Sequence, residues 1–402
     1  MIPENWNIFK LKDILEKVID FRGKTPKKIG MNWGEGNIPA LSANNVEMGK
    51  INLQKESYRG SDLLYKKWMI NGETAIGDVV MTMEAPLGNV AQIPDDEKYI
   101  LSQRVILLKT KEKFIQNNFL KYFLMSYFFR KQLFKNATGT TAKGIKQARL
   151  IELDILLPTL KEQEKIASIL SIVDNLIENT ENLINSCTLL KKGLMQTLLT
   201  KGIGHTEFKK TEIGEIPKEW EIKTIENLCE ILDSKRVPLN EETRNQMKGN
   251  IPYYGANGVV DYINDFIFNE DLILLAEDGG HFSEFKTRPI AYLISGKSWV
   301  NNHAHILRPK NYSNLLWIYY NLVHKDITYF IQGGTRTKLN QDSLRKIVLN
   351  YPKKIEERDK ITSILITVDE QINLFEGKKE NLNILKKGLM QQLLTGKIRV
   401  KT

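Results

Sequence analysis

The residue types that most often support metal-dependent chemistry occur together in the second half of the chain. The string AEDGGHFSEFK contains Asp278, Glu284 and Lys286. Two carboxylates and a lysine can hold a divalent cation and activate a water molecule, as in metal-dependent nucleases. Short acidic strings of this kind also arise by chance, so a metal nuclease centred on these residues is an alternative hypothesis.

Two histidines follow in the string NNHAH, where His303 and His305 would share one face of a β-strand. A metal site needs further ligands, and the chain has only 5 histidines and 2 cysteines. The cysteines, Cys187 and Cys229, form no CxxC pair and fit small buried residues. We therefore expect no resident metal, and a binding or packing role for the two histidines.

Motifs for other catalytic chemistry are missing from the sequence. It contains no GxxxxGK[ST] phosphate loop, no Asp/Asn-Pro-Pro-aromatic tetrad of an amino-methyltransferase and no GxSxG nucleophile turn. The sequence therefore predicts a binding protein rather than an enzyme.

The charge balance favours a polyanionic partner. The chain has 58 Lys and Arg against 48 Asp and Glu, a formal net charge of +10, and basic side chains release counterions from nucleic-acid phosphates. Apolar runs are too short for a membrane span, and the first residues lack the basic start and apolar core of a signal peptide. We expect a cytoplasmic protein with a polyanionic partner such as double-stranded DNA.

Side chains suited to DNA contact lie in Gly-, Thr- and Asn-rich turns of both halves. Asn and Arg read adenine and guanine edges, whereas Lys and Thr mostly contact the backbone. The candidate DNA-binding residues are Arg22, Lys24, Thr25, Lys27, Lys28, Ser42, Asn44, Asn45, Arg104, Thr140, Thr141, Lys143, Lys235, Arg236, Tyr253, Tyr254, Asn257, His281, Asn302, His303, Thr335, Arg336 and Lys338.

An internal repeat organises these turns. LKKGLMQTLLT at Leu190 recurs as LKKGLMQQLLT at Leu385, an offset of 195 (385 − 190), and IPENW near the start recurs as IPKEW at Ile216. The two halves keep their ends while their middles differ in length and sequence.

The repeated ends read as long helices, each of roughly 40 residues or about 60 Å. Thr159 and Glu162 suit a reciprocal capping box at the start of the first helix, and Gly202 suits its end. Gly193 and Gly388 interrupt the helical runs, which suggests a close helix crossing or a kink. The apolar stripes predict helix pairing or partner binding through Ile166, Leu170, Val173, Ile177, Leu190, Leu194, Leu198, Ile361, Leu365, Val368, Leu385, Leu389 and Leu393.

The middles alternate short β-like runs with turns, and each also carries one aromatic helix before its end. The fold class is therefore α+β, with an internal pseudo-two-fold repeat. The predicted segments are a first globular domain at 1–158, a long helix at 159–202, a second globular domain at 203–352 and a long helix at 353–402.

Across nearly its whole length the chain resembles the specificity (S) subunits of type I restriction–modification systems. The resemblance rests on both LKKGLMQ helix ends, on their approach segments such as TGTTAKGIKQARL and GGTRTKLNQDSL, and on GDVVMTMEAPLGNVAQIP, NIPALSANN and IPYYGANG. One departure is the start of the second helix, YPKKIEERDKI, which lacks the threonine cap of the first.

The resemblance implies two mainly β target-recognition domains separated by a coiled-coil pair of antiparallel helices, with each domain reading half of a bipartite DNA sequence. It implies two methyltransferase (M) subunits and restriction (R) subunits as partners. S-adenosylmethionine, ATP and Mg would be bound by those partners, and no cofactor by this chain. A third hypothesis is a coiled-coil assembly protein that does not bind DNA.

Overall fold

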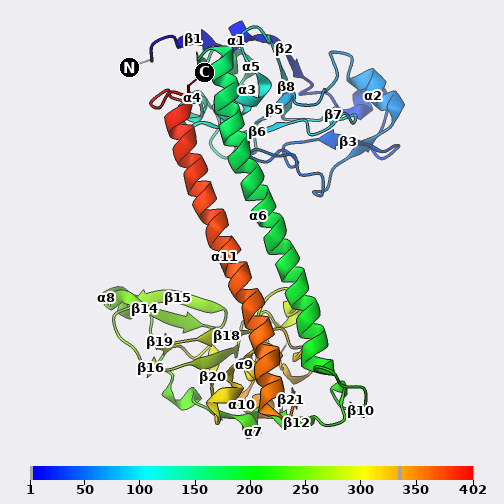
Figure 1. Cartoon of the computed structure of the whole chain (residues 1–402). Helices are drawn as coiled ribbons and strands as arrows, with labels where there is room; N and C mark the ends of the chain where they lie inside the picture. The colour runs from blue at the N-terminus through cyan, green and yellow to red at the C-terminus, as the bar shows by residue number, and fades with distance from the viewer. Residues whose placement is uncertain (1–2, 334–336, 402) are drawn as a thin grey trace. The chain divides into compact units, whose positions relative to one another are not determined.

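The computed structural model of the chain describes residues 3–333 and 337–401. Contacts divide the chain into two compact units (Figure 1): unit 1 comprises residues 1–181 and 377–402, and unit 2 comprises residues 182–376. Each unit contains one globular part together with pieces of both long helices. No helix in the described ranges is long and apolar enough to cross a membrane.

The globular part of unit 1 is a mixed α and β structure. Its helices are α1 (Leu11–Ile14), α2 (Asp62–Trp68), α3 (Asn117–Met125), α4 (Tyr127–Lys135) and α5 (Gln147–Leu150). Its strands are β1 (Asn7–Lys10), β2 (Leu15–Asp20), β3 (Ile38–Leu41), β4 (Arg59–Gly60), β5 (Val79–Met83), β6 (Leu87–Gln92), β7 (Ile100–Leu101), β8 (Val105–Thr110) and β9 (Asp154–Leu157).

The globular part of unit 2 follows the same plan with more strands. Its short helices are α7 (Ile225–Leu228), α8 (Glu241–Gln246), α9 (Leu315–Leu322) and α10 (Gln341–Arg345). Its strands are β10 (Phe208–Thr211), β11 (Gly214–Pro217), β12 (Glu221–Thr224), β13 (Cys229–Ile231), β14 (Lys248–Gly255), β15 (Gly258–Ile263), β16 (Phe268–Asn269), β17 (Leu272–Ala276), β18 (Ala291–Ile294), β19 (Lys297–Val300), β20 (Ala304–Pro309) and β21 (Val348–Tyr351).

The sheets of the two units correspond. A four-stranded antiparallel sheet has the order β2-β8-β5-β6 in unit 1 and β13-β20-β17-β18 in unit 2. A second sheet in each unit contains a parallel pair, β3 with β7 in unit 1 and β14 with β19 in unit 2. The conserved topology shows that the pseudo-two-fold repeat extends through the globular parts, although their sequences differ.

The inner strands β5 in unit 1 and β17 in unit 2, called here the central strands, are buried on both faces of their sheets, as their continuous apolar sequences require. In β5, Val79 and Met81 pack into one apolar cluster, while Val80 packs into another on the opposite face. In β17, Ile273 and Leu272 divide between two clusters in the same way. In unit 1 one face of the sheet thus packs against α3, α4 and the long helix α6 (Leu160–Lys201), and the other packs against α2.

The aromatic helix predicted in the first half is in fact two helices. Ser126 separates α3 from α4 with an extended backbone (φ −65°, ψ 153°), and its hydroxyl accepts a hydrogen bond from the Phe129 amide at 3.3 Å. The serine thus caps a new helix. Residues on both α3 and α4 enter the core, including Phe119, Phe123 and Phe129.

The two long helices are α6 (Leu160–Lys201) and α11 (Ile355–Leu393). Lys386 of α11 contacts Asp174 of α6 in unit 1 at 2.5 Å, and Lys191 of α6 contacts Asp369 of α11 in unit 2 at 2.5 Å. Later residues of one helix thus meet earlier residues of the other, so the pair is antiparallel in each unit. The expected α+β architecture is confirmed.

The apolar stripes of the long helices pack partly against the globular parts. Ile166 and Leu170 are completely buried in the core of unit 1, and Ile361 and Leu365 are buried likewise in unit 2. The helix starts therefore pack on the globular parts as well as on each other. Val173 and Leu393 are also buried, and the half-buried members of the predicted set are Ile177, Leu194, Leu198, Val368 and Leu389.

Two of the predicted pairing residues do not pair the helices. Leu190 is 54% exposed and Leu385 is 49% exposed. The adjacent Lys191 and Lys386 instead reach the other helix. Contact of the two leucines with a partner protein stays a prediction.

The expected close crossing at the helix glycines is wrong. A Cβ added to Gly193 or Gly388 would meet no atom within 4 Å, and both helices continue through these positions. Gly202 does follow the last residue of α6 and has a left-handed φ of 65°, the conformation that glycine favours at a helix end.

Only half of the predicted capping box forms. The Thr159 hydroxyl accepts a hydrogen bond from the Glu162 amide at 3.4 Å. The Glu162 carboxylate does not return to the cap, because it accepts hydrogen bonds from Trp6 Nε1 at 3.2 Å and Arg399 Nε at 2.6 Å. Contacts within unit 1 that lie far apart in the sequence thus outweigh the local motif.

Candidate nucleic-acid interface

Each unit has its own irregular surface, called here its mouth, around the end of β5 in unit 1 and the end of β17 in unit 2. In unit 1 the mouth contains residues 20–28, 42–47, 84–87, 102–104 and 138–144. In unit 2 it contains residues 233–238, 255–258, 277–280, 301–303 and the described part of the hairpin between Gln332 and Lys338.

The mouths share a backbone frame. The Met83 amide donates to the Arg104 carbonyl at 2.7 Å, and the Ile145 amide donates to the Met83 carbonyl at 3.1 Å. In unit 2 the Glu277 amide donates to the His303 carbonyl at 2.8 Å, and the Leu339 amide donates to the Glu277 carbonyl at 2.7 Å. In unit 1 the Gly/Thr-rich loop is therefore a small hairpin joined to the end of β5. In unit 2 the described residues Gln332 and Lys338 pair, and Leu339 joins this segment to the end of β17.

Each mouth surrounds a hollow. The hollow of unit 1 has a volume of about 490 Å³, and its lining includes the predicted residues Ser42, Asn44 and Arg104. The hollow of unit 2 has a volume of about 470 Å³, and its lining includes Asn302 and His303. The structure therefore brings several predicted residues of each half together around one concave surface.

The remaining predicted residues of unit 1 also lie in the mouth. Arg22 is held by Asp20, with Arg22 Nη2 2.6 Å from Asp20 Oδ2, and Lys28 donates to the Gly23 carbonyl at 2.6 Å. The exposed members of the predicted set in this unit are Lys27, Lys28, Asn44, Arg104, Thr140, Thr141 and Lys143, and the half-buried ones are Arg22, Lys24, Thr25 and Ser42.

Two predicted residues are structural. Asn45 is completely buried; its Oδ1 accepts from the Ser42 hydroxyl at 2.8 Å, so it shapes the turn. Tyr253 is 2% exposed, and its hydroxyl accepts from the Leu239 amide at 3.0 Å. Both side chains are thus engaged within the protein, although Tyr253 also lines the hollow of unit 2. DNA contact by either residue stays a prediction.

The predicted residues of unit 2 differ in their solvent exposure and in their hydrogen bonds within the protein. Asn257 donates to the Gly279 carbonyl at 2.9 Å, and His303 Nδ1 lies 2.5 Å from Asp278 Oδ1. The exposed residues are Lys235, Asn257, Asn302 and Lys338, and the half-buried ones are Arg236, Tyr254, His281 and His303. Thr335 and Arg336 lie outside the described residues.

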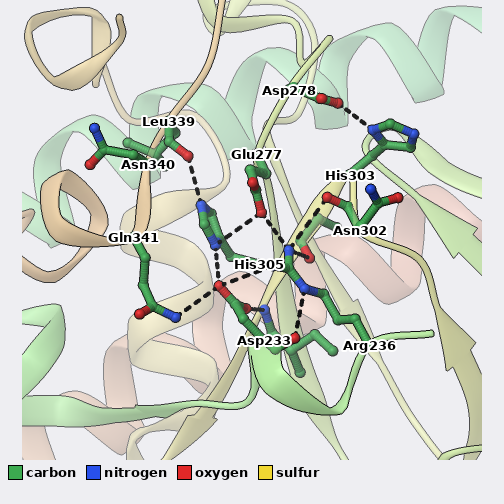
Figure 2. A network of polar contacts seen from close by, with 12 residues as sticks. Asp233, Arg236, Glu277, Asp278, Asn302, His303, His305, Leu339, Asn340 and Gln341 are labelled. Carbon is green, nitrogen blue, oxygen red and sulfur yellow. Dashed lines mark hydrogen bonds and ion pairs between the residues drawn. The ribbon is translucent and has the colours of Figure 1, made fainter. Parts of the chain in front are cut away.

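A buried polar network supports the mouth of unit 2 (Figure 2). His305 is 1% exposed; its Nδ1 lies 2.6 Å from Asp233 Oδ2, and its Nε2 lies 2.8 Å from the Leu339 carbonyl oxygen. Both partners are hydrogen-bond acceptors, and the ring lies between them. The histidine thereby ties the end of β13 to the base of the hairpin.

A second carboxylate completes the network. Glu277 forms an ion pair with Arg236, and Lys338 Nζ lies 3.0 Å from Glu277 Oε1. Arg236 also donates to the Ala304 carbonyl at 3.0 Å. The guanidinium N–H groups of Arg236 therefore donate to acceptors within the protein, which favours a positioning role over contact with a base.

The network keeps both carboxylates ionised. Burial alone would raise the pKa of Asp233, but hydrogen bonds from His305 and from the Ile306 amide outweigh it, and the pKa is lowered. Burial likewise opposes ionisation of Glu277, and hydrogen bonds from Arg236 and Lys338 lower its pKa. Two negative side chains thus lie among cationic donors.

This network does not suit a metal ion. Asp233, Glu277 and His305 are the one group in the described part of the chain whose ligand atoms converge closely enough to hold a metal. Arg236 and Lys338 already neutralise Glu277, so a divalent cation would meet positive charge. His305 serves packing and hydrogen bonding, as expected.

The alternative nuclease residues are separately engaged. Asp278 contacts His303, whereas Glu284 is exposed and contacts Arg288 at 3.5 Å. Neither carboxylate belongs to a converging ligand group among the residues described. The geometry therefore gives no support to a metal centre formed by Asp278, Glu284 and Lys286.

The repeated LKKGLMQ string has a structural explanation. In unit 1, Asp174 of α6 accepts a hydrogen bond from the Tyr122 hydroxyl at 2.8 Å and contacts Lys386. In unit 2, Asp369 of α11 accepts from the Tyr320 hydroxyl at 2.8 Å and contacts Lys191. The first lysine of each copy thus joins a helix pair to one globular part, and the same contact is needed twice.

These tyrosines predict a loss of stability in alkali. Burial and the neighbouring carboxylates raise the pKa values of Tyr122 and Tyr320 above the ordinary value. A raised folded-state pKa contributes stability below the unfolded-state value of about 10, and this contribution is lost as the pH rises above it. We expect the free energy of unfolding to fall more steeply above pH 10 in the natural chain than in Tyr122→Phe/Tyr320→Phe.

Denaturant titrations of both proteins at pH 8 and pH 11 would measure this difference. The phenylalanine variant is its own control for lysine ionisation, since all lysines are retained. Equal pH dependence in the two proteins would contradict the assignment of these hydroxyls as buried donors.

The sequence reasoning missed several residues of the mouths, including Glu84, Gln103 and Glu277. The turns SQR (102–104) and NNH (301–303) occupy equivalent places, between β7 and β8 and between β19 and β20, at an offset of 199. Gln103 thus corresponds to Asn302 and Arg104 to His303. SQRVILL and NNHAHIL share only one identical residue, so this equivalence could not be seen in the sequence.

Comparison with known proteins agrees with this doubled arrangement. The family model described as the Type I restriction modification DNA specificity domain matches residues 3–188 and again residues 217–383. The chain belongs to this family. Members of the DNA specificity family are non-catalytic subunits, so the resemblance seen in the sequence is confirmed and the metal-nuclease alternative is not supported.

Relatives in the DNA specificity family span the whole chain. The type I restriction enzyme MjaVIII specificity subunit of Methanocaldococcus jannaschii is 26% identical over 424 residues, which cover 100% of this chain and 94% of that protein. The MjaIX specificity subunit from the same organism is 25% identical over 440 residues, covering 99% of this chain and 95% of that one.

Solved structures share the fold. The type I restriction–modification S subunit from M. genitalium gives a TM-score of 0.63 with 18% identity, covering 97% of this chain and 96% of that chain. A chain from a study of complex assembly and conformational transition of the type I R-M system gives a TM-score of 0.55 with 14% identity, covering 99% of this chain and 100% of that one.

Proposed function

We propose that the chain is a non-catalytic recognition subunit of a type I restriction–modification enzyme, in which each unit reads one half of a bipartite, asymmetric DNA target. The observation that carries this proposal is the pair of mouths. They share a backbone frame but present different side chains, so two related surfaces can read two different sequences. A palindromic target would need no such difference.

The DNA-contacting residues follow from exposure in the mouths. Exposed lysines and threonines suit phosphate contact, and exposed amides suit base contact. The proposed set omits Asn45, Tyr253 and Arg236, whose side chains are engaged within the protein. It comprises Arg22, Lys24, Thr25, Lys27, Lys28, Ser42, Asn44, Arg104, Thr140, Thr141 and Lys143 in unit 1, with Lys235, Tyr254, Asn257, His281, Asn302, His303, Thr335, Arg336 and Lys338 in unit 2.

The long helices supply the docking surface in this proposal. Two methyltransferase subunits and the restriction subunits assemble on the chain, and the exposed Leu190 and Leu385 lie in the two copies of the repeated string. S-adenosylmethionine, ATP and Mg bind to those partners, and the complex acts in the cytoplasm. Isothermal titration of the purified chain with S-adenosylmethionine should show no binding.

Reconstitution tests the proposal. The purified chain and its cognate methyltransferase subunit should form a complex that methylates DNA only when both are present. Methylation by this chain alone, or identical methylation without it, would contradict a recognition role. DNA binding that does not weaken as salt rises would favour the assembly-protein hypothesis, because phosphate contacts release counterions.

A paired variant locates the phosphate contacts. Lys27→Ala/Lys28→Ala should weaken binding to all sequences and reduce the slope of log affinity against log salt by about 2, since each phosphate contact contributes roughly 0.9. Lys210→Ala, an exposed lysine on β10 outside the mouths, is the control and should leave the slope unchanged. An unchanged slope in the double variant would remove these lysines from the interface.

A further inference from the structure

Two turns in the mouths are built alike. Residues Ser102–Arg104 join β7 to β8, and residues Asn301–His303 join β19 to β20. The Ser102 amide donates to the Leu41 carbonyl at 2.9 Å, and the Asn301 amide donates to the Tyr254 carbonyl at 3.0 Å. The first residue of each turn is therefore hydrogen-bonded to the neighbouring parallel strand, which is β3 beside β7 in unit 1 and β14 beside β19 in unit 2.

The last residue of each turn is held as firmly. Arg104 Nε lies 2.8 Å from Glu84 Oε1, and His303 Nδ1 lies 2.5 Å from Asp278 Oδ1. The carbonyls of Arg104 and His303 also accept hydrogen bonds from the end of the central strand. Both ends of each turn are thus fixed by contacts within the protein.

The middle residues, Gln103 and Asn302, are exposed and line the two hollows. Gln103 Nε2 makes one long contact, 3.5 Å from the Lys24 carbonyl. The structure gives the Asn302 carboxamide no hydrogen bond to another described residue, although its main-chain carbonyl accepts from Arg236 (Figure 2). Each unit therefore presents a carboxamide on a rigid turn with its donor and acceptor available.

We propose that Gln103 and Asn302 are equivalent specificity-determining residues, each of which reads the major-groove edge of one adenine in the half-site of its own unit. This inference rests on the proposed DNA-recognition function. A carboxamide donates to adenine N7 and accepts from adenine N6, so its N–H and its carbonyl oxygen can satisfy one base edge together. The neighbouring Arg104 and His303 each pair with a carboxylate, whereas the two amides have no such partner among the described residues.

The rigidity of the turns is what makes this reading selective. Because the backbone of each turn is already held by hydrogen bonds within the protein, DNA binding needs to order only the side chain, and less affinity is lost to ordering than for a loose loop. The lysines of the mouth can hold the DNA backbone, but a phosphate contact does not distinguish one base from another. Selectivity therefore depends on the neutral amides.

The test uses the full chain assembled with its methyltransferase subunit. Methylation rates are measured for Gln103→Leu and Asn302→Leu on duplexes in which each base pair of the natural target is replaced in turn. Gln103→Leu should lose about 10- to 100-fold of discrimination at one adenine position in one half-site. Asn302→Leu should do the same in the other half-site, so each variant contains its own unaffected control.

Two further variants complete the design. Gln103→Glu should reject adenine at the same position, because a carboxylate accepts but does not donate. Asn264→Leu, an exposed amide of unit 2 outside the hollow, should change discrimination nowhere. Unchanged melting temperatures would show that the variants fold normally.

The inference is overturned if discrimination persists at every position in the leucine variants, or if rates fall equally for all sequences. It is also overturned if one variant alters both half-sites. These results differ from failure of the proposed function, in which the natural chain itself would direct no methylation to a bipartite sequence.

Discussion

Asp233→Ala should destabilise unit 2 by about 3–5 kcal/mol, the range for removing one partner from a buried ion pair. The Asp233 side chain is 6% exposed and accepts hydrogen bonds from His305 and from the Ile306 amide. Its removal leaves those donors without an acceptor and adds net positive charge around Glu277. Denaturant titration of the purified chain, followed by a signal from unit 2, measures the loss.

A surface ion pair provides the matched control. Lys12 and Glu152 form an ion pair at 2.7 Å, with side chains 47% and 50% exposed, and Glu152→Ala should cost less than about 1 kcal/mol. If Asp233→Ala cost no more than Glu152→Ala, the buried network would not be an energetic support for the mouth. The effect on DNA reading should be confined to the half-site of unit 2.

Glu162→Ala should destabilise unit 1 by about 2–3 kcal/mol. The carboxylate is 2% exposed and binds both the buried Trp6 indole and Arg399. Without the carboxylate, the Trp6 N–H has no acceptor, whereas Arg399, which is 41% exposed, can hydrogen-bond to water. The free-energy cost is therefore lower than for a fully buried ion pair. Chemical denaturation of the variant measures this loss.

The equivalent contact in unit 2 sharpens this prediction. Glu357 accepts a hydrogen bond from Trp220 Nε1 at 3.1 Å, and its other oxygen lies 2.7 Å from His205 Nε2. Glu357→Ala should therefore weaken unit 2 in the way that Glu162→Ala weakens unit 1. Glu162→Gln, which retains an acceptor for Trp6, should lose less than Glu162→Ala; an equal loss would show that the indole contact contributes nothing.

The overall organisation of the fold could be predicted because repeated sequence patterns encode it. Apolar residues at steps of three and four predicted both long helices, and α6 at Leu160–Lys201 differs little from the expected 159–202. Local chemistry could not show where contacts between distant residues would prevail. The Glu162 carboxylate binds Trp6 and Arg399 instead of completing the capping box. Lys386, rather than the exposed Leu385, contacts the other helix.

The candidate interface was predictable in type but not in detail. Residue chemistry identified loops rich in Lys, Thr and Asn, and five exposed or half-buried residues of these loops, Ser42, Asn44, Arg104, Asn302 and His303, line the two hollows. It could not distinguish Asn44, which is exposed, from Asn45, which is buried one residue later in the same turn. Gln103 escaped notice because its importance comes from a turn whose ends are fixed by residues distant in sequence.

The most direct test of the account is to sequence the methylated sites in a host that carries this chain and its cognate methyltransferase subunit. The account predicts one asymmetric sequence with two specified halves separated by an unspecified spacer, absent when the chain is deleted. A continuous motif, a palindrome, or the same methylation without the chain would contradict the claim that two unlike units each read half of the target.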